Sequence, residues 1–341
     1  MKKLVFLSLI TACASPIVPT LVPQDVGTDA LLQAISIVDE NTVWVSGHDA
    51  TFARTVNGGA TWDVFQHRTD DSLQFRDVHA FDESQIVLMS AGSGSLSRIF
   101  TVTDGVTWQE NFVMQDSFGF LDCMDFWDAE RGIAFGDSID EYPYILTTTD
   151  GGITWNRANT DHMPKAGKGE GGFAASGTCV TTGKNGLAWI ATGAGGNARI
   201  LFTNDYGTSW ESFASPMVKG EAAGHTSIDF VDALNGFITG GDLAKPDAYT
   251  ANCAFTIDGG KSWTLTSQPI SKGAFYGSTS VNFGDRNFTF ASGPKGLDYT
   301  SDFGQTWTQL DSANYWAVNI HDSGVGWVSG KDGRVMKIVL E

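Results

Sequence analysis

Short runs of apolar residues recur along the chain, and glycine-rich turns separate them. One run has the form of a half-buried strand, as at 34–38, 75–79 and 227–231. A second run ends in glycine, as at 43–47, 188–193, 236–241 and 326–330. Runs of this length, bounded by turn residues, are typical of β-strands. The pattern predicts an all-β protein.

A turn motif follows the third strand of most units and has the form Thr-x-Asp/Asn-x-Gly-x-Ser/Thr-Trp. Its six copies lie at 55–62, 101–108, 148–155, 203–210, 256–263 and 300–307. Successive copies begin 46, 47, 55, 53 and 44 residues apart, which is the length of a four-stranded propeller blade. The spacing therefore predicts one blade for each copy.

The residues of this motif suit a hairpin turn with an anchored side chain. The acidic or amide residue can hydrogen-bond its own backbone two residues on, and the glycine supplies a positive φ. The tryptophan is expected to bury its ring between neighbouring sheets. We expect a structural role for the acidic or amide residues, the glycines and the tryptophans of all six copies. These are Asn57, Asp104, Asp150, Asp205, Asp258 and Asp302; Gly59, Gly105, Gly152, Gly207, Gly260 and Gly304; and Trp62, Trp108, Trp155, Trp210, Trp263 and Trp307.

The repeat divides the chain into seven units, which begin near residues 30, 73, 119, 172, 225, 274 and 314. The last unit, 314–341, lacks the turn motif and a fourth strand. A propeller closes its ring to remove sheet edges, so residues before Ala30 are expected to supply the missing strand. Residues 30–341 are predicted to form a seven-bladed β-propeller of four-stranded blades, closed by an N-terminal strand.

The first residues have the pattern of a bacterial lipoprotein signal. Lys2 and Lys3 precede an apolar run at 4–10 that is too short to span a bilayer. Residues 10–13 resemble a lipobox, in which Cys13 would be the lipid-modified residue. We expect residues 1–12 to be the signal peptide and 13–29 to be a lipid-anchored linker and closing strand. An ordinary secretory signal with an incidental cysteine is the alternative.

This interpretation predicts an exported protein that is anchored by lipid in the bacterial envelope and faces the periplasm or the cell surface. Ala14 follows the lipobox cysteine, which favours the outer membrane.

Composition narrows the classes of partner. The net charge is −18, and the 21 basic residues are spread over the chain, which argues against nucleic-acid binding and against adhesion to anionic lipid. Contact with a membrane is expected only through the lipid anchor. No dinucleotide-binding or phosphate-binding loop is present, so we expect no cofactor.

The cysteines beyond the lipobox are Cys123, Cys179 and Cys253. Their spacing does not match a metal site, and we expect no bound metal. In an oxidising compartment at most one disulfide can form among three cysteines. Buried free thiols are the open alternative.

The repeated turns resemble the Asp-box (BNR) repeat. Propellers with this repeat include sialidases, sortilin-type receptor domains and photosystem II stability and assembly factors. Stretches at 75–82, 124–137, 169–180, 240–247 and 292–307 make nearly the whole mature chain similar to the bacterial branch of the last group. The resemblance implies a WD40/YVTN-like propeller with Asp-box hairpins. The photosystem members hold an immature membrane subunit with an arginine-rich patch, but the nine arginines here are scattered, so that patch is not carried over.

Polar residues are expected at one mouth of the ring, where loops entering the first strands meet loops joining second to third strands. A sialidase needs three converging arginines, yet only Arg76 lies on a predicted first strand, so we assign no catalytic residue. Glu170 lies among glycines at 168–173 that allow close backbone approach, and it ranks first together with Arg76. Solvated or hydrogen-bonding loop residues are the alternative interpretation. The candidates for binding a ligand or partner are Arg76, Asp77, Asp122, Glu170, His225, Asp242, Lys245, Lys295 and Tyr315.

A fold signature without a complete catalytic constellation favours a non-enzymatic binding or assembly scaffold of the cell envelope. We expect a monomer that holds a protein or glycan partner at the propeller mouth. The alternative is a glycoside hydrolase-like enzyme acting on an envelope or environmental polysaccharide, because an acidic mouth can place two carboxylates across one pocket.

Overall fold

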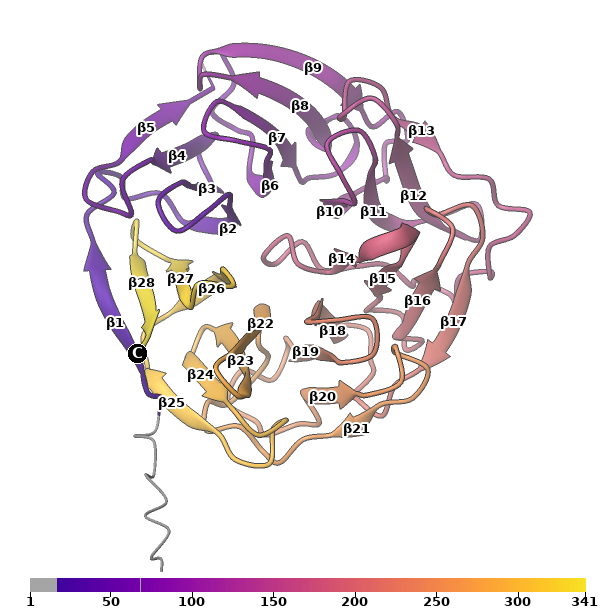
Figure 1. Ribbon diagram of the computed structural model, residues 1–341. Helices are drawn as coiled ribbons and strands as arrows, with labels where there is room; N and C mark the ends of the chain where they lie inside the picture. The colour runs from indigo at the N-terminus through magenta and orange to yellow at the C-terminus, as the bar shows by residue number, and fades with distance from the viewer. Residues whose placement is uncertain (1–16, 68) are drawn as a thin grey trace, which may run out of the picture.

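Seven four-stranded antiparallel sheets surround a central axis in the computed structural model, which describes residues 17–67 and 69–341 (Figure 1). Each sheet is one blade, and in blades 1 to 6 the strands run in sequence order from the axis outward. The all-β, seven-bladed fold predicted from the repeat is confirmed. Within the described residues, no helix is long and apolar enough to cross a membrane.

The strand bounds show how regularly the chain is divided. Blade 1 contains β2 (Leu32–Ile37), β3 (Val43–Gly47), β4 (Thr51–Thr55) and β5 (Asp63–Gln66); blade 2 contains β6 (Phe75–Ala80), β7 (Gln85–Ser90), β8 (Arg98–Thr103) and β9 (Thr107–Val113). Blade 3 contains β10 (Leu121–Phe126), β11 (Gly132–Ile139), β12 (Tyr142–Thr148) and β13 (Asn156–Arg157); blade 4 contains β14 (Val180–Thr182), β15 (Ala188–Ala191), β16 (Arg199–Thr203) and β17 (Glu211–Ala214). Blade 5 contains β18 (Ala223–Phe230), β19 (Gly236–Asp242), β20 (Cys253–Thr256) and β21 (Thr264–Leu265); blade 6 contains β22 (Gly277–Phe283), β23 (Arg286–Gly293), β24 (Gly296–Thr300) and β25 (Thr308–Asp311). Blade 7 contains β26 (Tyr315–Ile320), β27 (Val325–Gly330), β28 (Val335–Leu340) and the N-terminal β1 (Pro19–Gln24), and short 3₁₀ turns lie at η1 (Gly94–Leu96) and η2 (Lys184–Gly186).

The ring closes through its N-terminal strand. β1 pairs antiparallel with β28, from Pro19 opposite Leu340 to Gln24 opposite Val335. The two ends of the described chain therefore share blade 7, and Figure 1 shows them side by side. This pairing confirms the predicted closure and leaves β1, rather than β28, at the outer edge.

Apolar side chains fill the space between neighbouring blades. Trp44, Phe52 and Phe75 belong to one cluster that joins blade 1 to blade 2. Trp189 of blade 4 stacks on Phe230 of blade 5 with their ring centroids 3.8 Å apart. Each fully buried side chain of this size contributes about 1.5–3 kcal/mol by leaving water. The core is thus a series of interfaces around the ring, and it holds each blade against the next.

The repeated turns other than the second share two hydrogen bonds from backbone amides to side chains, illustrated by the third copy. Asp150 Oδ1 accepts from the Thr154 amide at 2.8 Å, and Thr148 Oγ1 accepts from the Gly152 amide at 3.0 Å. The indole nitrogen of Trp155 donates to the Gly152 carbonyl at 3.0 Å. The acidic side chain therefore bonds the backbone four residues on, rather than two as expected, because the turn is wider than a two-residue loop.

The second copy differs from the others. Asp104 and Gly105 both have positive φ, 52° and 69°, and the Val106 amide donates to the Thr103 carbonyl at 3.1 Å. This is a tight two-residue hairpin of the kind that Asp-Gly favours. Asp104 occupies the turn itself and does not have the capping position of Asp150.

One disulfide joins blade 3 to blade 4. Cys123 on β10 is bonded to Cys179, the residue before β14, with Cα atoms 5.8 Å apart. Cys253 is a buried thiol, and burial raises its pKa well above the usual value. The limit of one disulfide, drawn from the cysteine count, agrees with this pairing.

Candidate functional site

The first strands of the seven blades line a central channel (Figure 1). The strand registers place one polar residue of each blade at an equivalent height in this channel. We call these residues the polar ring: Ser36, His79, Asp125, Thr181, Asp229, Thr279 and Asn319. Together with their neighbours they line a cavity of about 190 Å³.

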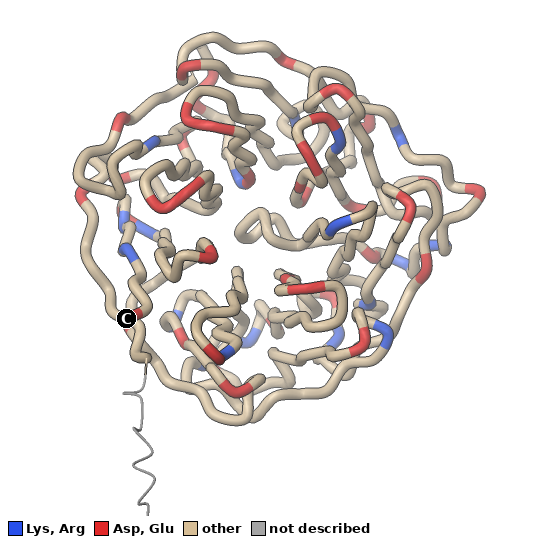
Figure 2. The backbone as a smooth tube through the Cα atoms, viewed as in Figure 1, with Lys and Arg blue, Asp and Glu red and all other residues tan. Residues whose placement is uncertain are grey.

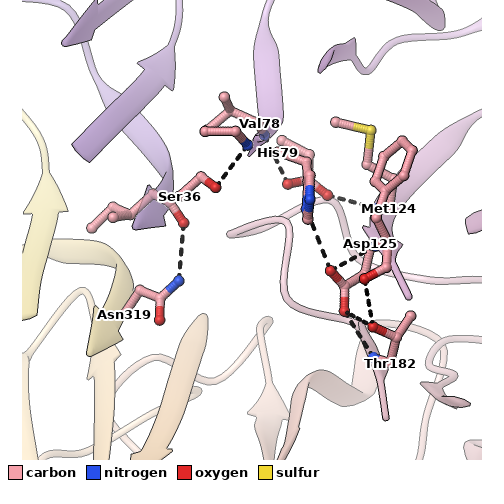
Figure 3. Close-up of polar contacts among 11 residues, drawn as sticks. Ser36, Val78, His79, Met124, Asp125, Thr182 and Asn319 are labelled. Atoms are coloured by element: carbon pink, nitrogen blue, oxygen red, sulfur yellow. Dashed lines mark hydrogen bonds and ion pairs between the residues drawn. The ribbon is translucent and has the colours of Figure 1, made fainter. Parts of the chain in front are cut away.

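Hydrogen bonds between blades fix the polar ring (Figure 3). Ser36 Oγ accepts from the Ala80 amide at 2.9 Å, and Asp125 Oδ2 accepts from the Thr182 amide at 2.8 Å. Asp229 Oδ2 accepts from the Ser280 amide at 2.5 Å. In each case the acceptor lies on one first strand and the donor on the next. These bonds hold the side chains of Ser36, Asp125 and Asp229 in place without the help of a ligand.

A loop closes one end of the channel. We call residues 171–178, which precede β14, the plug loop; Figure 1 shows the chain before β14 reaching toward the axis. Ser176 Oγ donates to the Tyr276 carbonyl at 2.7 Å, and the Ala174 carbonyl accepts from Arg76 Nη1 at 3.2 Å. Thr178 Oγ1 donates to Ser227 Oγ at 2.7 Å. These contacts anchor the plug loop to blades 2, 5 and 6, on the side where the first strands begin.

The opposite end of the cavity is open. The side chains of His79 and Asp125 are 25% and 28% exposed, whereas Ser176 of the plug loop is 1% exposed. The cavity is therefore a pit that has the plug loop as its floor and opens where the first strands end. We call this side of the molecule the pit face.

The pit is acidic. Asp77, Asp125 and Asp229 line it together with His79, and no lysine or arginine of the described residues is in the lining. Burial raises the pKa of Asp229 to about 6, against the lowering effect of the Ser280 and Phe230 amides. Burial also raises the pKa of Asp77 well above its usual value, although its oxygens accept from the amides of Val78 and Met124. His79 Nδ1 lies 3.5 Å from Asp125 Oδ1.

Acidic turns surround the open end of the pit. These are the turns between the first and second strands, and Figure 2 shows their acidic residues arranged around the channel. We call their acids the acidic collar: Asp39, Glu40, Asp82, Glu83, Asp128, Glu130, Asp232, Asp285 and Asp322. Arg131 and Lys184 are the basic residues of these turns, and Arg131 is paired with Asp128 at 3.1 Å.

Local backbone geometry accounts for part of the collar. Asp39 Oδ1 accepts from the amides of Asn41 and Thr42 at 2.8 and 2.7 Å, and Asp82 makes the same pair of bonds in blade 2. These amides hold the pKa of Asp39 below its usual value. The turn chemistry thus places a charged carboxylate at the rim of the pit in several blades.

Arg76, Asp77 and Asp122 come together around the plug loop. Arg76 binds the Ala174 carbonyl and the Gln74 side chain, and burial lowers its pKa. Asp122 is 1% exposed, and burial together with nearby Asp137 raises its pKa well above the usual value. Asp77 is the one predicted site residue that also lines the pit.

Glu170, which directly precedes the plug loop in the chain, forms a second group with His225. Glu170 is 2% exposed, and its oxygens accept from Arg199 Nε and Thr192 Oγ1 at 2.8 Å and from the Gly167 amide at 2.7 Å. His225 is fully buried, and burial lowers its pKa to about 4. Its Nδ1 contacts the Thr192 carbonyl at 2.7 Å, which links it to the Glu170 group.

The other predicted residues lie apart from these groups. Asp242 pairs with Lys245 at 2.7 Å, and Lys295 pairs with Asp247 at 2.8 Å. Tyr315 donates to Asp311 Oδ2 at 2.9 Å, and burial raises its pKa. The predicted residues therefore do not converge on a single open pocket.

His79, Asp125, Asp229 and Asn319 were not singled out by the sequence. A signal was present, since an acid followed by phenylalanine ends the apolar run at 124–126 and again at 228–230. Aligning the first strands of all units at this point would have shown a polar residue in every unit. The site was predicted instead at the opposite mouth, because the longer loops there contain lysines and acids.

Comparisons with known proteins agree on the fold. No protein-family model and no curated protein matches the sequence. Among solved structures, YCF48 bound to D1 peptide has a TM-score of 0.66 at 16% identity, over 95% of this chain and 97% of that one. YCF48 from Cyanidioschyzon merolae has a TM-score of 0.65 at 15% identity, over 94% and 98%. The WD40 β-propeller domain of Doa1 has a TM-score of 0.62 at 13% identity, over 94% and 95%.

These likenesses support the expected resemblance to photosystem II assembly-factor and WD40 propellers at the level of fold. The Asp-box family and its bacterial branch stay predictions. Residues 1–16, with Cys13, lie outside the described residues.

Proposed function

We propose that this propeller is a non-enzymatic binding scaffold that holds a protein partner on its pit face. The acidic pit carries the proposal, because it is a preformed, solvent-open cavity whose polar side chains are fixed by the fold. One of the solved propellers with a similar fold is a complex with a peptide. The pit face lies opposite the mouth that the sequence favoured, where the plug loop fills the channel.

The location of the scaffold is part of the proposal. The lipobox-like segment at 10–13 supports export and a lipid anchor on Cys13 in the bacterial envelope. Changing Cys13 to serine should release the protein from the membrane fraction, which immunoblotting of separated fractions would measure. Retention of the variant in the membrane fraction would remove the anchor from the proposal.

The geometry gives no specific support to the glycoside hydrolase alternative. Glu170, its first candidate, accepts three hydrogen bonds within the protein and is nearly fully buried. A general acid or base needs hydrogen-bond reach to its substrate. Turnover in a glycan panel that is lost in Glu170→Gln, with folding intact, would return this alternative to first place.

Site-specific photo-cross-linking in the producing cell tests the scaffold. A photoreactive residue is placed at Glu40 or Ala233, which are exposed on the pit face, or at Asp71 or Glu221, which are exposed in loops leading into first strands on the opposite side. We expect the same protein to be captured from both pit-face positions and from neither control. Equal capture from the two faces, or no recurring product, would overturn the proposal.

A further inference from the structure

We infer that the pit face binds a basic polypeptide segment and that one lysine or arginine side chain of this segment enters the pit. This inference rests on the proposed function and specifies the chemistry of the partner. The pit and the acidic collar are its two supports, and they lie on the same side of the ring.

Charge complementarity identifies the partner as basic. The acids of the collar outnumber the two basic residues of the same turns, and one of these two is already paired. The repeated turns add Asp150 and Asp258 to this side, and Lys261 with them, because the amides of Gly151 and Gly259 bond collar-turn carbonyls at 2.8 and 3.0 Å. Arg54, which donates to the Glu83 carbonyl, is already paired with Asp63, so acids remain in excess. A surface of one sign steers an oppositely charged partner and excludes those of like charge.

The size of the pit selects a side chain rather than a larger ligand. Sites for small molecules and cofactors usually enclose about 300–1,000 Å³. The pit encloses about 190 Å³, which is too little for a saccharide chain and suits the end of one long side chain. The acidic collar is wide enough to contact residues on either side of that side chain, because it follows all the blades except blade 4.

The acidic side chains of the lining can accept further hydrogen bonds, beside hydroxyl and amide groups that can both donate and accept. Each carboxylate oxygen of Asp125 and Asp229 takes part in a bond with the backbone, yet a carboxylate has about four acceptor positions, so capacity remains. An ammonium or guanidinium group brings donors and no acceptor. In residues 17–67 and 69–341, no group of three or more His, Cys, Asp or Glu is arranged to hold a metal ion. The pit therefore matches an organic cation.

Binding to defined peptides tests the inference. The probes are four labelled decapeptides with a glycine–serine backbone and three copies of lysine, arginine, glutamine or glutamate, and spermidine serves as a free polyamine. We expect the lysine and arginine peptides to bind the purified full-length protein and the other two to show no binding. Equal binding of the lysine and glutamine peptides would overturn the inference, as would spermidine binding as tightly as the peptides.

Two kinds of variant distinguish the contribution of the pit to peptide binding from that of the acidic collar. Thr181→Lys places a cation of the protein itself in the pit, and the Thr181 side chain makes no hydrogen bond within the described part of the chain, so folding should be retained. We expect this change, and Asp125→Asn with Asp229→Asn, to speed dissociation by at least about tenfold. Glu40→Gln with Glu83→Gln should instead slow association and weaken its salt dependence. Glu221→Gln on the opposite face should change neither rate.

The outcomes also separate the two proposals. If the pit face captures a partner in cells but Thr181→Lys leaves both that capture and peptide dissociation unchanged, the scaffold stands and the basic-segment inference fails. If no partner is captured from the pit face, the proposed function itself fails.

Discussion

Buried ionisable side chains near the axis make individual residues of this propeller sensitive to pH. Asp77, Asp122 and Asp229 are carboxyl groups whose pKa values are raised by burial, and His225 is an imidazole whose pKa is lowered by burial. In each case the neutral form is favoured in the folded protein. The two kinds of group have opposite effects on stability as the pH falls.

His225 should make the protein less stable in mild acid. Its pKa is about 4 in the folded protein and about 6.5 in an unfolded chain, so the unfolded form binds more protons between these values. The free energy of unfolding should fall by about 3 kcal/mol as the pH is lowered through this window. Urea titrations of the protein and of His225→Gln should show this change in the difference between their free energies of unfolding, because the buried acids act equally in both.

Asp229 should make binding at the pit depend on pH. Its pKa of about 6 means that it gains a proton as the pH falls through that value, and the pit then loses negative charge. The other titratable groups facing it are Asp77 and His79 on β6 and Asp125 on β10. Affinity for the lysine peptide should fall between pH 7 and pH 5. An unchanged affinity over this range, measured by fluorescence anisotropy, would contradict the assignment; in Asp229→Asn the dependence should be weaker.

At the scale of elements, the repeated turn and its tryptophan define blades 1 to 6. Asp258 shows what the acidic residue contributes: its oxygens accept from Thr256 Oγ1, the Ser262 amide and Ser262 Oγ at 2.8, 3.0 and 2.6 Å. Asp104 lies in the tight second turn, where backbone conformation matters more than side-chain bonds.

This contrast leads to a matched pair of substitutions. Asp258→Ala removes three hydrogen bonds and should lower the free energy of unfolding by about 3 kcal/mol. Asp104→Ala should cost less than about 1 kcal/mol, since it loses only the tolerance of aspartate for positive φ. Thermal and urea unfolding of both variants measures the difference. Equal losses would mean that the two turns are stabilised in the same way.

The elements were largely predictable because the signals that specify them are local. First strands begin at Leu32, Phe75, Leu121, Val180, Ala223, Gly277 and Tyr315, close to the expected unit starts except at blade 4. There the start near 172 falls on the plug loop, whose path depends on distant partners such as Tyr276. The polar ring was missed because register shifts in several first strands, as between Phe75 and Asp77, decide which side chain faces the axis. Sequence periodicity does not reveal such bulges.

At the scale of the whole molecule, stability depends on a closed circle of blades. Every blade packs against two neighbours, and the last one is completed by a strand from the other end of the chain. Removing β1 would expose β28 as an unpaired edge, and unpaired edges pair with other chains.

Replacing residues 19–24 with glycine and serine should therefore lower the melting temperature and cause self-association. The matched control replaces the exposed loop residues 244–247 in the same way. Calorimetry and size-exclusion chromatography should show a less stable, associating protein in the first case and an unchanged one in the second. A monomeric β1 variant with an unchanged melting temperature would show that closure contributes little.

The pairing of Pro19 with Leu340 also has a consequence for biosynthesis. β1 is one of the first segments to leave the ribosome, but it is the last strand to find its partner, because β28 is made at the end of synthesis. Pairings between such distant residues form slowly, since a long loop must close before they bring any gain. Blades 1 to 6 can assemble in order while the chain emerges, but the circle waits for the final residues, and until then the apolar faces of blade 1 and of the last completed blade are open to chaperones or to other nascent chains.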